Sequence, residues 1–284
     1  MDFNFQADVN PFGILYNPLT ISQAIRRLLQ GKSLSETNLV LHNEMYHSLI
    51  HHGDFSNTDK SACLSTISKR FSAAEESISK TDIFLITFGT AYVYRWKETD
   101  EVVGNCHKIP AEKFIRFRLS VDEIVAEWTE IISEIKNRNE KAKFIFSVSP
   151  IRHWKDGAHE NQVSKSILHV AIDGLQNRFS DVHYFPAYEI LLDELRDYRF
   201  YAEDMMHPSS VAINYIWERF SETYFSDKTM EINQEWLPIL RAYQHKPFDS
   251  ESKAHQKFLE QTQEKEQTFF KKHAKTFARL KKFM

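Results

Sequence analysis

Three short and almost uninterrupted apolar runs stand out along the chain, each ending at a glycine or just before a proline. They are Asp82–Gly89, Lys143–Ser149 and Val182–Phe185. Short runs rich in β-branched and aromatic residues are typical of parallel strands that are covered on both faces. A fourth strand is predicted at Asn4–Val9, ahead of a turn sequence that contains proline and glycine.

Segments with helical periodicity lie between these runs. Thr20 is expected to cap one helix and Gly31 to end it, and Ser120 with Glu123 forms a capping-box pattern at the start of another. The predicted helices are Thr20–Gln30, Asp59–Ser79, Ser120–Asn137, Asn161–Phe179, Ala187–Leu195 and Pro208–Tyr224. Alternation of strands and helices predicts an α/β fold with a doubly wound parallel sheet.

The chain changes character toward its C-terminus. Residues 250–284 carry nine Lys/Arg and four Glu, and their apolar positions form only a thin helical stripe. We therefore expect an α/β domain over residues 1–228 and a helical extension over residues 229–284. The extension is interpreted as a helix that packs on the domain or on a partner, with a basic surface for nucleic acid or anionic lipid as the alternative.

Composition narrows the class of protein. The 284 residues are 42% apolar and 13% aromatic with only 7 Gly, which excludes glycine-rich chains and disorder over most of the length. A net charge of -3 argues against nucleic acid as the partner of the whole chain. Two cysteines give no disulfide framework, and neither a signal peptide nor a membrane span is recognisable. The sequence thus favours a soluble cytoplasmic protein.

The strongest candidate for chemistry is the pair Asp204 and His207, between the last strand and a helix. An aspartate three residues before a histidine can direct its carboxylate at Nδ1 of the ring. That contact fixes the tautomer and leaves Nε2 free to act as a general base. The same spacing is also common in surface or capping pairs.

Two further candidates follow predicted strands. Gly89 and Thr90 come after the first of the three apolar runs, where backbone N–H groups can approach an oxyanion. Arg152 and His153 follow the second, and an arginine there can bind a carboxylate or phosphate with two hydrogen bonds. A plain turn and a surface arginine are the alternatives.

Asn105 and His107 flank Cys106, and the spacing does not fit a zinc site or a thiol protease. No phosphate-binding or dinucleotide-binding glycine motif is present. We therefore expect neither a metal nor an organic cofactor.

Six ordered motifs together resemble the bacterial GSCFA-domain family, which is placed near the SGNH/GDSL hydrolases. The resemblance extends over roughly residues 9–226. The motifs are Asn10–Pro18, Phe88–Ala91, Gly104–Lys108, Ser149–His153, Tyr198–Tyr201 and Asp204–Pro208.

This resemblance implies an SGNH-like three-layer α/β/α sandwich with flavodoxin-like strand order and serine esterase activity, with an acylated carbohydrate as the candidate substrate. His207 and Asp204 would be catalytic, and Gly13, Gly89 and Thr90 would be oxyanion donors. Ala91 stands where the wider superfamily has an asparagine donor. The residues expected to contact substrate are Asn105, His107, Arg152 and His153. The alternative is a non-catalytic module on the same fold that binds a glycan or a partner.

The resemblance also implies a departure from the family. The family is named for a Gly-Ser-Cys-Phe-Ala stretch ahead of the Asn10 motif, and its serine would be the nucleophile. Only nine residues precede Asn10 here, and none is serine. A truncated gene model and a shortened paralogue both explain this. In either case we expect the first strand to be missing and the chain to be inactive.

Overall fold

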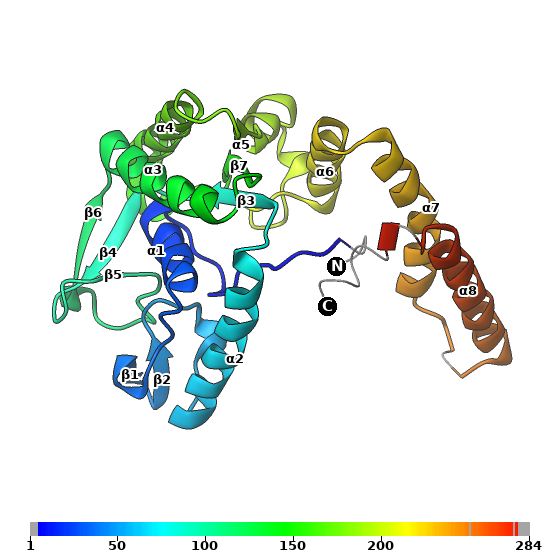
Figure 1. The fold of residues 1–284 in the computed structure, drawn as a ribbon, viewed down its shortest axis with the longest axis horizontal. Helices are drawn as coiled ribbons and strands as arrows, with labels where there is room; N and C mark the ends of the chain where they lie inside the picture. The colour runs from blue at the N-terminus through cyan, green and yellow to red at the C-terminus, as the bar shows by residue number, and fades with distance from the viewer. Residues whose placement is uncertain (1–4, 250, 275, 278–284) are drawn as a thin grey trace. The chain divides into compact units, whose positions relative to one another are not determined.

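The computed structural model describes residues 5–249, 251–274 and 276–277. The described part is a mixed α/β fold in which a three-stranded parallel sheet lies among helices (Figure 1). The α-helices are α1 Pro18–Leu29, α2 Lys60–Ile78, α3 Val121–Arg138, α4 Gly157–Gln176, α5 Ala187–Glu189, α6 Ser210–Tyr224, α7 Asp227–Gln244 and α8 Lys253–Lys272.

The parallel sheet has the order β3-β7-β8, formed by Ile83–Phe88, Lys143–Val148 and Val182–Tyr184. These are the three strands that the apolar runs predict. β3 and β7 run in register from Ile83 opposite Lys143 to Phe88 opposite Val148, so their carboxyl ends meet at one edge of the sheet. The SGNH-like sandwich itself remains a prediction.

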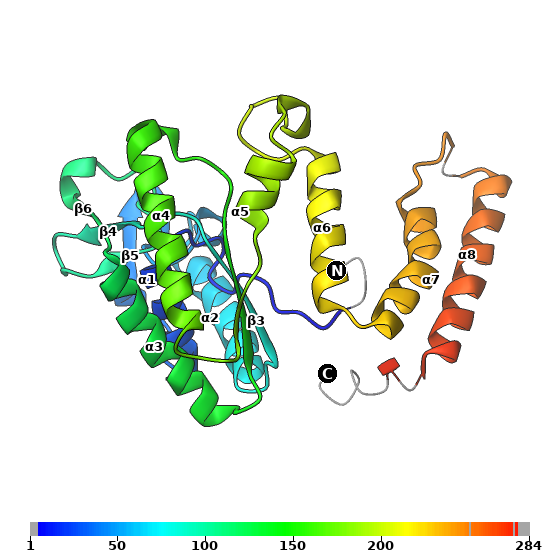
Figure 2. The same ribbon diagram turned by 90° about the horizontal axis from the view of Figure 1, so that it is seen from above.

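The main core lies between this sheet and the helices beside it. Phe88, Phe146 and Trp128 are fully buried, and the indole of Trp128 lies 5.2 Å and 5.1 Å from the two phenyl rings. α3 and α4 lie side by side in two perpendicular views (Figure 1 and Figure 2). Burial of these large aromatic rings, together with the aliphatic side chains around them, stabilises the core.

Of the two N-terminal helix caps that the sequence predicts, one is confirmed and one is wrong. Asp59 caps α2, and Ser120 forms the expected capping box with Glu123 at the start of α3. The prediction that Thr20 caps α1 was wrong. Asn17 is the cap residue, since its side chain accepts the Thr20 N–H at 2.9 Å, and Pro18 begins the helix.

Two antiparallel sheets have no counterpart among the predicted strands. One is a hairpin, and the other has the order β5-β4-β6. Their strands are β1 Leu39–His42, β2 Met45–Ser48, β4 Tyr92–Trp96, β5 Val102–Val103 and β6 Phe114–Arg118. The antiparallel sheet β5-β4-β6 lies between β3 and α3 in sequence. It positions several side chains near the end of β3.

Two further predictions need correction. Residues 5–9 of the predicted strand Asn4–Val9 form no strand, since none of them is hydrogen-bonded to a neighbouring strand. Asn4 lies outside the described residues. The last predicted helix begins at Ser210 rather than Pro208, because Pro208 pairs with Tyr201 in an isolated bridge.

The chain divides into two compact units. One comprises Asp8–Ile216, and the other comprises the chain from Trp217 onward together with residues before Asp8. The second unit contains the α7 and α8 helices, whose shared core is Trp236, Ile239 and Phe269. No described helix is long and apolar enough to cross a membrane. The domain boundary at residue 228 stays a prediction.

Candidate active site

The carboxyl ends of β3 and β7 are tied together by a buried lysine. Lys165, on α4, donates from Nζ to the carbonyl of Gly89 at 2.6 Å and to the carbonyl of Ser149 at 2.5 Å. The side chain is fully buried, and burial lowers the pKa of its amine to about 7. The loops that follow β3 and β7 therefore share one anchor.

The N–H groups of Gly89 and Thr90 both point at one oxygen. They donate to the carbonyl of Tyr16 at 2.7 Å and 2.9 Å, respectively. A Cβ added to Gly89 would lie 2.9 Å from that same oxygen, so only glycine permits this approach. The two predicted oxyanion donors thus form a paired site that an oxygen of the chain itself occupies.

Gly13 has a different local role. Its N–H donates to the carbonyl of Asn10 at 2.8 Å and closes a turn, and its φ of 77° lies in the left-handed region. A Cβ at Gly13 would lie 2.2 Å from the Cβ of His52. This glycine therefore allows two loops to pack closely.

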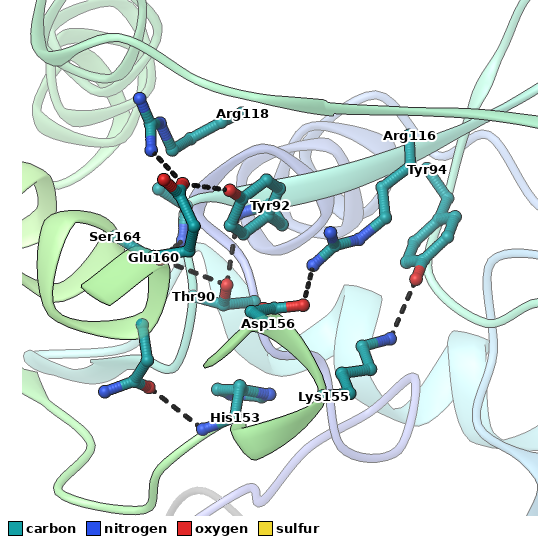
Figure 3. A network of polar contacts seen from close by, with 12 residues as sticks. Thr90, Tyr92, Tyr94, Arg116, Arg118, His153, Lys155, Asp156, Glu160 and Ser164 are labelled. Carbon is teal, nitrogen blue, oxygen red and sulfur yellow. Dashed lines mark hydrogen bonds and ion pairs between the residues drawn. The ribbon is translucent and has the colours of Figure 1, made fainter. Parts of the chain in front are cut away.

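A polar network surrounds the side chain of Thr90 (Figure 3). Its hydroxyl lies 3.2 Å from that of Ser164 and accepts the Tyr92 N–H at 3.1 Å. The phenol of Tyr92 donates to Glu160 at 2.7 Å, and Arg118 donates to the same carboxylate oxygen at 2.6 Å. β4 and β6 are thereby joined to α4 beside the end of β3.

The same network continues toward the turn before α4. Arg116 donates to Asp156 at 2.5 Å, and its guanidinium lies 3.8 Å from the centre of the Tyr92 ring. Lys155 donates to the phenol of Tyr94 at 2.8 Å. Figure 3 shows these partners lying between the antiparallel sheet and the start of α4.

Asp204 and His207 form the predicted pair. His207 Nδ1 lies 2.5 Å from Asp204 Oδ2, and Oδ1 of the same carboxylate accepts the N–H groups of Met206 and His207, each at 2.9 Å. These hydrogen bonds, the one from the His207 backbone above all, lower the pKa of Asp204 to about 2. The carboxylate is therefore ionised and held in place at all physiological pH values.

The second nitrogen of the His207 ring remains open. Among the residues that the structure describes, none forms a hydrogen bond with Nε2. The imidazole is about half exposed, at 55% of its side-chain surface. An Asp–His pair with one nitrogen bound and the other accessible is the arrangement that general-base catalysis requires.

Arg152 and His153, on the loop after β7, contact aromatic side chains of two other loops. The guanidinium of Arg152 is 6.0 Å from the Tyr201 ring, and the backbone of Tyr201 pairs with Pro208, next to His207. The imidazole of His153 lies edge-on to Tyr16 at 6.4 Å. Burial, and then the charge of Lys165, lowers the pKa of that imidazole.

Asn105 and His107 are directed elsewhere. His107 Nε2 lies 2.8 Å from the carbonyl of Ser48, its ring stacks on His47 at 4.4 Å, and Asn105 Oδ1 accepts the His107 N–H at 2.9 Å. Their contacts hold a loop against the end of β2. The structure thus brings Gly89, Thr90, Arg152 and His153 to neighbouring loops and gives Asn105 and His107 bonds to a different part of the unit.

Two residues that contact the loops after β3 and β7 were not predicted from the sequence. Lys165 falls on the inward face of α4 with Asn161, Ser164 and Leu168, and polar residues on a buried helical stripe were the available signal. Tyr16 contributes its backbone carbonyl, which no side-chain pattern reveals. Cys106, which the sequence argument set aside, has its thiol pKa raised by burial to about 11, which disfavours the reactive thiolate.

The sequence matches two models of known protein families. A model described as "GSCFA family" matches residues 1–220, and one described as "GSCFA domain protein, C-terminal domain" matches residues 236–282. No curated protein and no solved structure matches the chain.

Proposed function

We propose that this chain, which belongs to the GSCFA family, carries the base and orienting carboxylate of an ester hydrolase of the SGNH type. The observation that carries the proposal is the 2.5 Å contact between His207 Nδ1 and Asp204 Oδ2, with Nε2 left accessible. In this role Nε2 takes the proton of an attacking hydroxyl and later returns it to the leaving alcohol. Asp204 stabilises the imidazolium that forms in between.

The nucleophile in this proposal is a serine of the Gly-Ser-Cys-Phe-Ala type, and no such stretch occurs among the 284 residues. Among the described residues, no serine hydroxyl forms a hydrogen bond with His207 Nε2. We therefore expect residues 1–284 alone to hydrolyse esters poorly. Hydrolysis requires the serine to be supplied.

The proposed oxyanion donors are Gly89 and Thr90. Both N–H groups already converge on the Tyr16 carbonyl at 2.7 Å and 2.9 Å, so they have the geometry that an oxyanion requires. Their use in catalysis requires the Tyr16 carbonyl to move away. Gly13 is not needed for this step, because its N–H closes a turn.

The proposed substrate is an acylated carbohydrate held by Arg152 and His153. Both side chains lie on the loop after β7, where Arg152 is 6.0 Å from the Tyr201 ring and His153 is 6.4 Å from the ring of Tyr16, whose carbonyl accepts the paired N–H groups. Asn105 and His107 are left out of substrate contact, because their hydrogen bonds are made with the loop beside β2.

Turnover of p-nitrophenyl acetate tests the proposal. The protein for this assay is the chain extended at its N-terminus by a segment that contains Gly-Ser-Cys-Phe-Ala. We expect His207→Ala to lower the rate of the extended protein by about 100-fold or more, because general-base catalysis contributes about that factor. The matched control is His159→Ala, which removes an exposed histidine of α4. Equal rates for the extended protein and its His207→Ala variant would contradict the proposal.

A second candidate, a binding module without catalysis, is favoured by one observation. The paired N–H groups of Gly89 and Thr90 are filled by the Tyr16 carbonyl, as expected of loops fixed for recognition. Glycan binding by an extended protein whose ester hydrolysis is insensitive to His207→Ala would select this alternative.

A further inference from the structure

Arg152 differs from the arginines around it because it lacks a carboxylate partner. No carboxylate oxygen of the described residues lies within 4.0 Å of its guanidinium, and none of its N–H groups forms a hydrogen bond with a described residue. Arg116 and Arg118, by contrast, are neutralised by Asp156 and Glu160 at 2.5 Å and 2.6 Å. The five N–H donors of Arg152 are therefore available to a ligand.

The guanidinium is held in place by aromatic rings. It lies 5.7 Å from the ring of Trp154 and 6.0 Å from that of Tyr201, and the Tyr201 ring lies 5.7 Å from that of Tyr198. We call these four residues the Arg152 cluster. Cation–π contacts orient an arginine and leave its hydrogen-bonding edge unused.

Large aromatic surface is exposed in the Arg152 cluster. Trp154 is 50% exposed and Tyr198 is 66% exposed. Indole and phenol rings offer a flat apolar face with a polar edge. Such a face suits the C–H side of a sugar ring, whose hydroxyl groups point outward from its rim.

Arg152 supplies the positive charge of the Arg152 cluster. Lys165 is bound to the carbonyls of Gly89 and Ser149, and it has no described carboxylate partner. Ser149 begins the same loop that carries Arg152. Three acidic groups of this region are already paired, Asp156 and Glu160 with arginines and Asp204 with His207. An anionic ligand therefore gains more here than a neutral one.

We infer that the Arg152 cluster binds the anionic group of a charged carbohydrate, a carboxylate or a phosphate on a sugar, so that the ester cleaved at His207 belongs to an acidic glycan. This inference rests on the proposed function, whose substrate class it specifies. Arg152 binds the anion with paired hydrogen bonds, and the exposed rings of Trp154 and Tyr198 stack on the sugar. Tyr201 links this subsite to His207 through its backbone pairing with Pro208.

Equilibrium binding, which needs no catalysis, tests the inference on the 284-residue chain. The probes are hexagalacturonate, a phosphorylated oligomannose and neutral maltohexaose, titrated calorimetrically at low salt. We expect one of the two charged probes to bind at least about tenfold more tightly than maltohexaose, and the one that binds identifies the anion. Arg152→Gln is expected to weaken that binding about tenfold or more. Arg152→Lys keeps the charge but loses the paired hydrogen bonds, so its affinity for the charged probe should lie between that of the wild type and that of Arg152→Gln.

The matched control is Arg196→Gln, which removes an exposed arginine outside the Arg152 cluster and should leave binding unchanged. Circular dichroism of each variant confirms that it is folded. Equal affinity of the three probes, or wild-type affinity in folded Arg152→Gln, would overturn the inference. If ester hydrolysis by the extended protein is insensitive to His207→Ala while Arg152→Gln still abolishes charged-probe binding, the proposed chemistry fails and the anionic subsite stands.

Discussion

Lys165 places an amine in the core without a carboxylate partner. Its pKa is ordinarily 10.5, and burial lowers the pKa to about 7 in the folded chain. Below pH 7 the amine is protonated in both the folded and the unfolded state. Between about pH 7 and pH 10.5 the unfolded chain keeps a proton that the folded chain releases, so this group makes the free energy of unfolding rise with pH.

The variant Lys165→Met should remove this pH dependence. We expect the free energy of unfolding of the wild type to rise relative to that of the variant by about 1 kcal/mol per pH unit between pH 7.5 and pH 9.5. Urea unfolding of both proteins across this range measures the difference. Parallel stability curves would show that the amine does not titrate in the folded chain.

Gly89 permits a second test at the level of one residue. Gly89→Ala places a methyl group 2.9 Å from the Tyr16 carbonyl, where the backbone must shift. We expect a loss of about 1–3 kcal/mol in the free energy of unfolding. Gly53→Ala is the matched control, because nothing lies within 4 Å of its added Cβ and its effect should stay within about 0.5 kcal/mol. Equal stability of the two variants would contradict the close approach.

At the candidate site, the sequence predicts side-chain contacts better than backbone contacts. The Asp204–His207 contact follows from local spacing on one loop, so the sequence suffices to predict it. The occupation of the Gly89 and Thr90 N–H groups depends on where the distant Tyr16 carbonyl lies. A long-range contact of this kind leaves no trace in residue type.

Among the elements, β3 is an edge strand with an apolar exposed face. Within the part of the chain that the structure describes, β3 pairs only with β7, and Ile83 and Leu85 are 53% and 63% exposed. A long uncharged edge strand is a template for pairing with another chain. β3 is therefore the element of the sheet most prone to self-association.

Leu85→Lys should reduce that self-association. We expect less light scattering on concentration, with the free energy of unfolding changed by no more than about 0.5 kcal/mol, because the side chain points away from the core. The control is Val170→Lys, an exposed apolar position at 55% on α4, where no strand edge is available. If both variants scatter less by the same amount, added charge rather than the β3 edge is responsible.

The strands that the sequence predicts differ in residue pattern from those that it does not predict. The three parallel strands are nearly continuous in apolar character, so their pattern predicts strands, although only β7 is buried on both faces and β3 has one exposed face. β4 and β6 carry arginines within short aromatic runs, which lack a clear alternation and therefore gave no strand prediction. Pro238 lies inside α7, where the packing of Trp236 and Ile239 against Phe269 sustains the helix.

At the scale of the whole molecule, the two compact units have separate cores. The main core lies within Asp8–Ile216, and the α7–α8 pair is held by Trp236, Ile239 and Phe269. Separate cores permit separate unfolding, so a single two-state transition is not expected.

Trp236→Ala tests this independence. We expect it to destabilise the second unit by about 3–5 kcal/mol, because a buried indole is lost from a small core. Hydrogen exchange should show protection lost in α7 and α8 and retained in α3 and β7. The control is Trp217→Phe, which keeps an aromatic ring at a position that is 37% exposed. Simultaneous loss of protection in both units would contradict the division.

The Tyr16 carbonyl has a consequence for selectivity. An oxygen tethered through the backbone acts as a resident competitor for the two N–H groups of Gly89 and Thr90, at the high effective concentration of an intramolecular contact. A neutral carbonyl of an ester makes hydrogen bonds no stronger than those of Tyr16 and so gains nothing by displacing it. An oxyanion makes hydrogen bonds about twice as strong. In the proposed ester hydrolysis, the resident oxygen is therefore displaced by the oxyanion of the transition state and not by the ester carbonyl of the ground state.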